Sequence, residues 1–177
     1  EKITVSQTAD SIKLSWKAVE GATGYRVYLY DTKAKKYKTL GTTEKLSCTI
    51  KKLKAGAEYK FAVKAYTRTE KETLWAKNYT ELLTSTKPTV PVVTAKAEAG
   101  KASLSWKEVS GATGYVVYMS EKKDSGFEKI GSTKKLSCTI KNLKKGKTYY
   151  FKVKAYTKVD GKNVYSGATK AIAVKVK

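Results

Sequence analysis

Histidine is absent from this sequence of 177 residues, and arginine, cysteine and proline are scarce. Without histidine the chain lacks the commonest general base and metal ligand of proteins. It also has no Cys-x-x-Cys pair, phosphate-binding glycine loop or serine elbow. No apolar run approaches the roughly 20 residues that a membrane-spanning helix needs. These absences predict a chain that is not an enzyme, holds no cofactor or metal and does not insert into a membrane.

The positive charge of the chain comes almost entirely from lysine. Lys and Arg total 37 against 15 acidic residues, a formal net charge of +22, and only Arg26 and Arg68 are arginines. Since specific contacts to bases and phosphates rely on the arginine fork, we expect no specific nucleic-acid partner. A lysine coat fits either a solvated, functionally silent surface or diffuse attraction to a polyanion.

The second half of the sequence repeats the first at a spacing of 90 residues, and the identities fall on apolar and turn residues, as a shared core requires. Residues 87–91 lie between the copies and hold both prolines of the chain. Fixed φ angles and missing donors make such a stretch a short, semi-rigid linker. We predict a first domain over residues 1–87, a linker over 88–91 and a second domain over 92–177.

The two cysteines, Cys48 and Cys138, occupy the same Leu-Ser-Cys-Thr-Ile-Lys phrase, one in each copy. Equivalent points in adjacent domains of this size lie roughly 30 Å apart. A disulfide needs Cα atoms within about 7 Å of each other. We therefore expect two buried, reduced and unpaired thiols.

Within each copy, apolar and polar residues alternate with a period of two. Ile12, Leu14 and Trp16, for example, alternate with Lys13 and Ser15. Turn signals such as Ala-Gly, Ser-Gly and Asp-Gly separate the alternating segments. Short strands at this spacing are typical of a sandwich. The pattern predicts an all-β fold without long helices.

Three short motifs occur at matching places in both copies. Each copy has a tryptophan that ends its second strand, a Tyr-x-Val on the third, and a Leu-x-x-Gly-x-x-Tyr phrase before a long strand. Together they resemble the signature of a fibronectin type III domain, including its tyrosine corner. The resemblance implies two tandem immunoglobulin-like, seven-stranded antiparallel sandwiches. The core residues it marks are Trp16, Tyr25, Leu53, Tyr59, Trp106, Tyr115, Leu143 and Tyr149.

Two further phrases, Gly-Ala-Thr-Gly-Tyr and Lys-Val-x-Gly-Lys-x-Val-Tyr-Ser, are similar to versions in surface and polysaccharide-degrading proteins of Gram-positive bacteria. The resemblance implies a non-catalytic, extracellular spacer of a larger cell-surface or secreted protein, monomeric as a fragment. The first residues have no signal character, so we expect any secretion signal outside this sequence. The alternative is an adhesion module that binds an anionic glycan or polysaccharide, a cell-wall polymer, or a host or surface protein.

A binding surface, if there is one, is expected on the outward face of the sheet that holds the third and sixth strands, where tyrosines and lysines mix. Tyrosine rings can stack on sugars while lysines meet carboxylates or phosphates. The alternative is that the same side chains form cross-strand pairs, worth roughly 0.2–1 kcal/mol each. Trp75 and Tyr165 occupy matching positions after a loop that differs between the copies (residues 67–72 and 157–162). Each of them could either pack over the edge of the sandwich or contact a ligand. The candidate face residues are Tyr28, Tyr30, Lys64, Tyr66, Tyr118, Tyr150, Lys154 and Tyr156.

Overall fold

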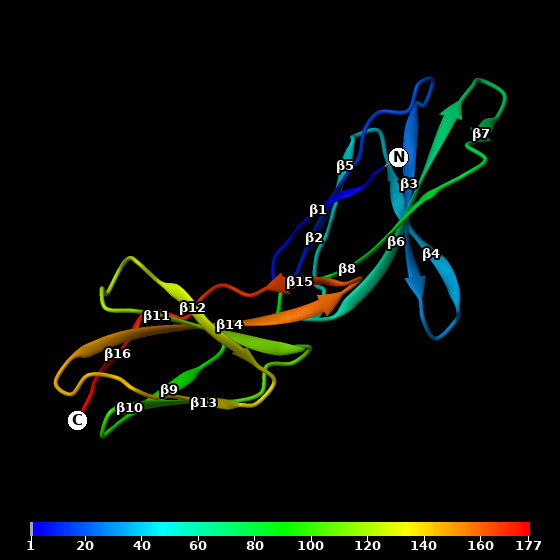
Figure 1. The fold of residues 1–177 in the computed structure, drawn as a ribbon. Helices are drawn as coiled ribbons and strands as arrows, with labels where there is room; N and C mark the ends of the chain where they lie inside the picture. The colour runs from blue at the N-terminus through cyan, green and yellow to red at the C-terminus, as the bar shows by residue number, and fades with distance from the viewer. Residues whose placement is uncertain (1) are drawn as a thin grey trace. The chain divides into compact units, whose positions relative to one another are not determined.

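A computed structural model describes residues 2–177 and divides the chain into two compact units, residues 1–86 (unit 1) and 87–177 (unit 2) (Figure 1). All regular elements of the described residues are strands. Each unit is treated by itself below.

Unit 1 consists of two antiparallel sheets. The smaller has the order β1-β2-β5, and the larger has the order β4-β3-β6, with β7 and β8 both paired to β6. The strands are β1 (Thr4–Gln7), β2 (Ile12–Ser15), β3 (Gly24–Asp31), β4 (Lys36–Thr43), β5 (Ser47–Ile50), β6 (Glu58–Arg68), β7 (Thr73–Trp75) and β8 (Thr80–Ser85).

Unit 2 repeats this arrangement. Its smaller sheet has the order β13-β10-β9, and its larger sheet has the order β12-β11-β14, with β15 and β16 both paired to β14. The strands are β9 (Val93–Glu98), β10 (Lys101–Trp106), β11 (Gly114–Ser120), β12 (Glu128–Thr133), β13 (Ser137–Ile140), β14 (Thr148–Val159), β15 (Lys162–Tyr165) and β16 (Ile172–Lys175).

The last strand of each sandwich is broken into two pieces. In unit 1, β7 pairs with the end of β6, from Tyr66 to Arg68, and β8 pairs with its beginning, from Glu58 to Val63. In unit 2, β15 and β16 pair with β14 in the same way. The predicted all-β fold of two seven-stranded sandwiches is therefore confirmed, with the seventh strand interrupted in both copies.

The alternation of apolar and polar residues places the core between the two sheets. On β14, Phe151, Val153 and Ala155 are all 0% exposed, while the intervening Lys152 and Lys154 are half-buried on the opposite face. Successive side chains of a strand point to opposite faces of its sheet, so a period of two separates core from surface. Each unit has its own core cluster built in this way.

The tryptophans of the predicted core are buried in both units. Trp16 is 8% exposed and Trp106 is 6% exposed, and the neighbouring Tyr25 and Tyr115 are also buried. The indole and phenol ring centroids lie 5.4 Å apart in unit 1 and 5.1 Å apart in unit 2. Of the other predicted core residues, Leu143 and Tyr149 are buried, whereas Leu53 and Tyr59 are half-buried and pack against the cluster.

Each unit contains a tyrosine corner. The Tyr59 hydroxyl accepts a hydrogen bond from the Lys54 backbone N–H at 2.9 Å, and the Tyr149 hydroxyl accepts one from Lys144 at 3.3 Å. The glycine inside each motif has a positive φ, 64° at Gly56 and 78° at Gly146, which a residue with a Cβ adopts only with strain. The motif that suggested the fold therefore ties the sixth strand to the turn before it.

A second tyrosine in each unit makes a comparable bond that the sequence motifs did not reveal. The Tyr25 hydroxyl accepts a hydrogen bond from the Val19 N–H at 2.9 Å, and the Tyr115 hydroxyl accepts one from the Val109 N–H at 3.0 Å. Each bond holds the loop after the tryptophan strand onto the third strand. A typical net contribution is about 1 kcal/mol.

Both cysteines are free, but the prediction that they are buried is wrong, because each is only half-buried. Cys48 lies on β5 and Cys138 on β13, which are edge strands of their three-stranded sheets. An edge strand has a neighbour on one side only, so its inward side chains keep an open flank. The partial burial still raises the pKa of each thiol above its ordinary value.

Candidate functional site

The outward face of the larger sheet of unit 1 carries four tyrosines in edge-to-face contact. Tyr37 lies centrally, with ring centroids 6.3 Å from Tyr28, 5.2 Å from Tyr30 and 5.9 Å from Tyr79. Tyr79 is 51% exposed, and the other three are half-buried. Sequence reasoning selected Tyr28 and Tyr30 but missed Tyr37 and Tyr79. The pairing of Tyr30 with Tyr37 across β3 and β4 would have revealed one of them, had the register been known.

A carboxylate lies beside this group of tyrosines and contacts its central member, Tyr37. Glu81 on β8 accepts a hydrogen bond from the Tyr37 hydroxyl at 2.5 Å and forms a salt bridge with Lys60 at 2.7 Å. Burial, followed by the hydrogen bond to Glu81, raises the pKa of Tyr37 to about 12. The hydrogen bond to Lys60 lowers the pKa of Glu81, and the same bond raises the pKa of Lys60. The charge of Lys60 is thus already neutralised within the unit.

Tyr66 requires a correction, because it lies on the predicted outward face but is only 7% exposed. Its ring covers Gly24, where an added Cβ would lie 2.5 Å from the phenol oxygen. Trp75 packs against it with ring centroids 5.2 Å apart. The missing side chain of Gly24 leaves a groove that the Tyr66 ring fills, so Tyr66 is a packing residue and not a ligand contact.

Trp75 itself takes part in packing on this face. The Arg26 guanidinium lies over the Trp75 ring, 4.2 Å from its centroid, and Trp75 is 37% exposed. Lys64, the remaining candidate of unit 1, is half-buried and borders a shallow hollow of about 150 Å³ that Tyr28, Tyr37 and Tyr79 also line. Unit 1 therefore brings Tyr28, Tyr30 and Lys64 together.

The outward face of the larger sheet of unit 2 has lysines over aromatic rings. The Lys154 ammonium lies 5.5 Å from the centroid of Tyr118, and the Lys152 ammonium lies 4.0 Å from that of Phe127. Tyr118 and Lys154 were predicted to share this face, whereas Lys152 and Phe127 were missed. Favourable cation–π contacts of this kind hold the ammonium groups in place without neutralising them.

The other two candidates of unit 2 lie elsewhere on the same face. Tyr156 is half-buried and repeats the packing of Tyr66, since an added Cβ at Gly114 would lie 2.6 Å from its hydroxyl oxygen. Its ring centroid is 5.8 Å from that of Tyr165, which is 38% exposed. Tyr150 is half-buried and lies opposite Ser120 and Ala173 in the strand register.

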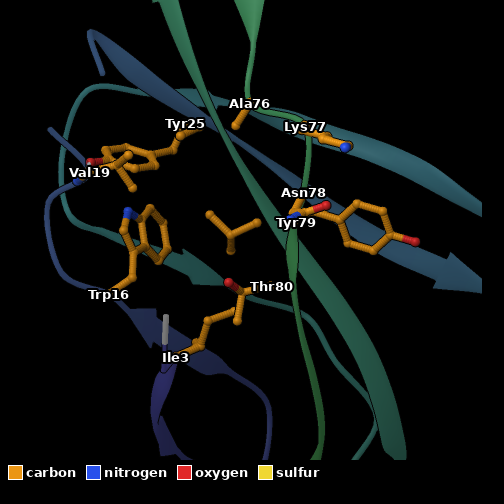
Figure 2. Close-up of a pocket in the computed structure, with 11 residues that line it drawn as sticks. Ile3, Trp16, Val19, Tyr25, Ala76, Lys77, Asn78, Tyr79 and Thr80 are labelled. Carbon is orange, nitrogen blue, oxygen red and sulfur yellow. Dashed lines mark hydrogen bonds between the residues drawn. The ribbon is translucent and has the colours of Figure 1, made fainter. Parts of the chain in front are cut away.

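Unit 1 also has an apolar hollow of about 430 Å³ beside its buried tryptophan. Figure 2 shows Trp16, Val19 and Tyr25 on one side of it and the segment from Ala76 to Thr80 on the other. The side chains of Lys77 and Tyr79 point away from the tryptophan (Figure 2). The volume falls within the usual range of small-molecule sites, but the lining has few convergent polar groups.

The hollow lies where the two units differ in sequence. In unit 2, the Ser166 and Thr169 hydroxyls accept hydrogen bonds from the Ala155 and Val153 N–H groups, at 3.0 and 3.1 Å. The matching residues of unit 1 are Ala76 and Tyr79, which have no such hydroxyl near the backbone of β6. The buried Nε1 of Trp16 has no hydrogen-bond partner, but the Nε1 of Trp106 has none either. The unpaired indole is therefore a shared feature of the fold and does not indicate a ligand.

Residues 2–177 contain no group of three or more cysteine, aspartate or glutamate side chains placed to hold a metal ion. Over the same residues, no helix is long and apolar enough to cross a bilayer.

Two antiparallel sandwiches, each with a buried tryptophan and a tyrosine corner, define an immunoglobulin-like class of module. The family model for the fibronectin type III domain matches residues 1–78 and 86–170. The chain belongs to the fibronectin type III family and contains two copies of its domain.

Solved structures show the same fold. A segment of two fibronectin type III domains from chicken tenascin superposes with a TM-score of 0.55 at 17% identity, over 99% of this chain and 98% of that one. The FN1–FN3 domains of chicken CNTN1 superpose with a TM-score of 0.50 at 18% identity, over 99% of this chain and 66% of that one. No curated protein sequence matches the chain. At these identities the likeness concerns the fold alone.

Proposed function

We propose that this chain is a non-catalytic spacer within a larger extracellular protein, where it separates a functional domain from the surface that carries it. Domains of this family are typically structural or adhesion modules. The observation that carries the proposal is that each unit encloses a complete core of its own. Such a unit keeps its folded length without help from a partner, ligand or disulfide.

The proposal includes the setting of the parent protein. The two phrases noted in the sequence and the excess of lysine support a surface or polysaccharide-degrading protein of a Gram-positive bacterium. Cys48 and Cys138 are both free, so the folded length of each unit does not depend on a disulfide.

Force spectroscopy on the whole chain, pulled from its two ends, tests the spacer role. We expect two discrete unfolding events, one for each unit. The units contain 86 and 91 residues, and an extended chain spans about 3.3–3.6 Å per residue, so each event should release roughly 300 Å of contour length. Continuous extension at low force, without discrete events, would mean that the units cannot hold their length and would exclude this role.

The second candidate function is adhesion, and the uneven chemistry of the two outward faces favours it. In unit 1, Lys60 forms a salt bridge with Glu81. In unit 2, Lys152 and Lys154 lie over aromatic rings and, within the described part of the chain, form no salt bridge with an acidic residue. Retention of the chain on purified wall material or on an anionic polysaccharide at physiological salt tests this candidate. Retention that vanishes by about 0.15 M salt would leave the spacer role alone, since surface attraction is screened beyond about 8 Å there.

A further inference from the structure

The outward face of the larger sheet in unit 2 concentrates positive charge, and none of its described strand residues is acidic. The strand register places the lysines of β14 on the side opposite the buried Phe151 and Val153. It also places lysines of β12 and β16 on that side, because they pair with outward residues of β11 and β14. The lysines of this face, called the basic face below, are Lys129, Lys152, Lys154, Lys158 and Lys175.

None of these lysines forms an ion pair within the described residues. The salt bridge described for unit 2 joins Lys147 and Glu121, neither of which belongs to the basic face. Lys129, Lys158 and Lys175 are exposed, and Lys152 and Lys154 are half-buried beside aromatic rings. Like charges gathered on one face repel one another, so a multivalent anion that binds across them is favoured.

The matching face of unit 1 differs in composition, although the two units share a fold: it keeps Arg26, Lys64 and Arg68 but has fewer lysines and includes acidic residues. Ala62 stands where unit 2 has Lys152, Thr39 where it has Lys129, and Ser85 where it has Lys175. The face of unit 1 also presents Glu58 and Glu81 at outward positions of its register. The lysine-rich outward face is therefore specific to unit 2 and is not a simple result of the lysine excess of the whole chain.

The geometry of the basic face suits a linear polymer. Lys152, Lys154 and Lys158 lie in a row along β14, and strand rise of about 3.3 Å per residue spreads them over roughly 20 Å. On the same face, Tyr150 lies on β14 at the end of that row, and Tyr118 on β11 pairs with Lys152. Tyrosine rings flanking a row of cations provide apolar surface for sugar rings and positive charge for their acidic groups.

We propose that the basic face of unit 2 binds a linear, acidic polysaccharide laid along β14. The lysines meet its carboxylates, and Tyr118 and Tyr150 pack against its sugar rings. The proposal rests on the adhesion candidate and names its ligand class. It does not depend on the spacer role, because force spectroscopy measures folded length and the experiment below measures retention.

The test is affinity electrophoresis or column retention of the whole chain on immobilised polygalacturonate over a series of salt concentrations. The variant K152Q/K154Q/K158Q removes the row on β14. The control K96Q/K101Q/K141Q removes the same charge from exposed positions in the smaller sheet of unit 2 and directly after its strand β13. Circular dichroism checks that both variants stay folded.

We expect the first variant to weaken binding at about 0.05 M salt by about tenfold or more and to flatten its salt dependence, and the control to weaken it less than about threefold. Equal weakening by both variants would show that only the net charge acts, and would overturn the proposal. Binding of neutral dextran equal to that of polygalacturonate would overturn it as well.

A second variant separates sugar recognition from charge. Tyr118→Ser combined with Tyr150→Ser keeps the net charge and avoids Tyr156, whose ring packs against Gly114. We expect a loss of about threefold to tenfold in affinity for polygalacturonate and a clearly smaller loss for polyphosphate, which has no sugar ring and senses only the displaced Lys154 ammonium. An equal effect on both polymers, or none on either, would exclude the polysaccharide. Tighter binding of single-stranded DNA than of polygalacturonate would reassign the face to nucleic acid.

Discussion

Single residues in this protein contribute either through packing or through charge. The two tryptophans contribute through packing. Trp16 and Trp106 are buried beside a tyrosine in equivalent settings, and neither indole nitrogen has a hydrogen-bond partner. Their contribution is therefore the burial of apolar ring surface. An unpaired buried N–H adds a cost of its own, which a hydrocarbon ring would avoid.

Truncation of either tryptophan to alanine should lower the free energy of unfolding of its unit by roughly 3–5 kcal/mol, because a large cavity remains. Replacement by phenylalanine should cost clearly less, since no hydrogen bond is lost. Chemical denaturation of Trp16→Ala, Trp16→Phe and the matching Trp106 variants measures this. A phenylalanine variant as unstable as the alanine variant would show that the indole nitrogen does matter.

Tyr37 shows the second case, because its ionisation depends on a carboxylate from another strand. Its folded pKa of about 12 lies above the ordinary value near 10. A raised pKa means that the fold favours the neutral phenol. The stabilisation from this group is complete below about pH 10 and is lost as the pH rises from about 10 to 12.

The change Glu81→Gln should move the pKa of Tyr37 down towards its ordinary value but not fully to it, because burial, the larger cause, remains. Nuclear magnetic resonance of Cζ-labelled tyrosine gives the titration, and Tyr37→Phe assigns the signal. A pKa unchanged by Glu81→Gln would show that the carboxylate contributes nothing to the shift.

At the scale of elements, the third and sixth strands are locked together through a glycine and a tyrosine that face each other. Gly24 pairs with Tyr66 across β3 and β6, and Gly114 pairs with Tyr156 across β11 and β14. The ring of each tyrosine lies where a Cβ of the glycine would be. The repeated Gly-Ala-Thr-Gly-Tyr phrase thus has a packing role as well as a turn role.

Gly24→Ala should destabilise unit 1 by about 1–3 kcal/mol, the usual cost of overpacking. Gly114→Ala should cost less, because Tyr156 is half-buried and its ring can move outward more easily than the buried Tyr66. Thermal denaturation of both variants compares them. The double variant Gly24→Ala with Tyr66→Leu should recover part of the loss, and no recovery would place the strain elsewhere.

At the scale of the whole molecule, the chain is a series of two units, each with its own core cluster and its own tyrosine corner. The linker between the units is short. Nothing in the sequence of either unit indicates a large apolar face for docking. Stability should therefore reside within each unit, and the pair should be weakly coupled.

Residues 1–86 and 87–177 expressed separately should each melt within about 4 °C of the corresponding transition in the whole chain, because about 1 kcal/mol shifts the melting temperature of such a domain by 4–8 °C. Differential scanning calorimetry of the two pieces and the pair makes the comparison. A piece that fails to fold alone, or a single cooperative transition for the pair, would show strong coupling.

The sequence by itself determined the repeat, the strand alternation and the tyrosine corner. These features are local or periodic, and each follows from the alternation of side chains along a strand or from a turn beside it. The family resemblance rested on the same residues, Trp16 and Tyr59 among them. Most of the fold was therefore predictable without coordinates.

Only the tertiary structure decided which outward residues are available. The alternation of side chains along the strand predicted that Tyr66 lies on the surface. Its ring is instead buried over Gly24 and against Trp75, and neither residue is its neighbour in sequence. Glu81 reaches Lys60 and Tyr37 from β8, while no acidic residue shares the outward face around Lys152 and Lys154 in unit 2. Charge and exposure depend on strand register across the sheet, and register brings together residues far apart in the chain.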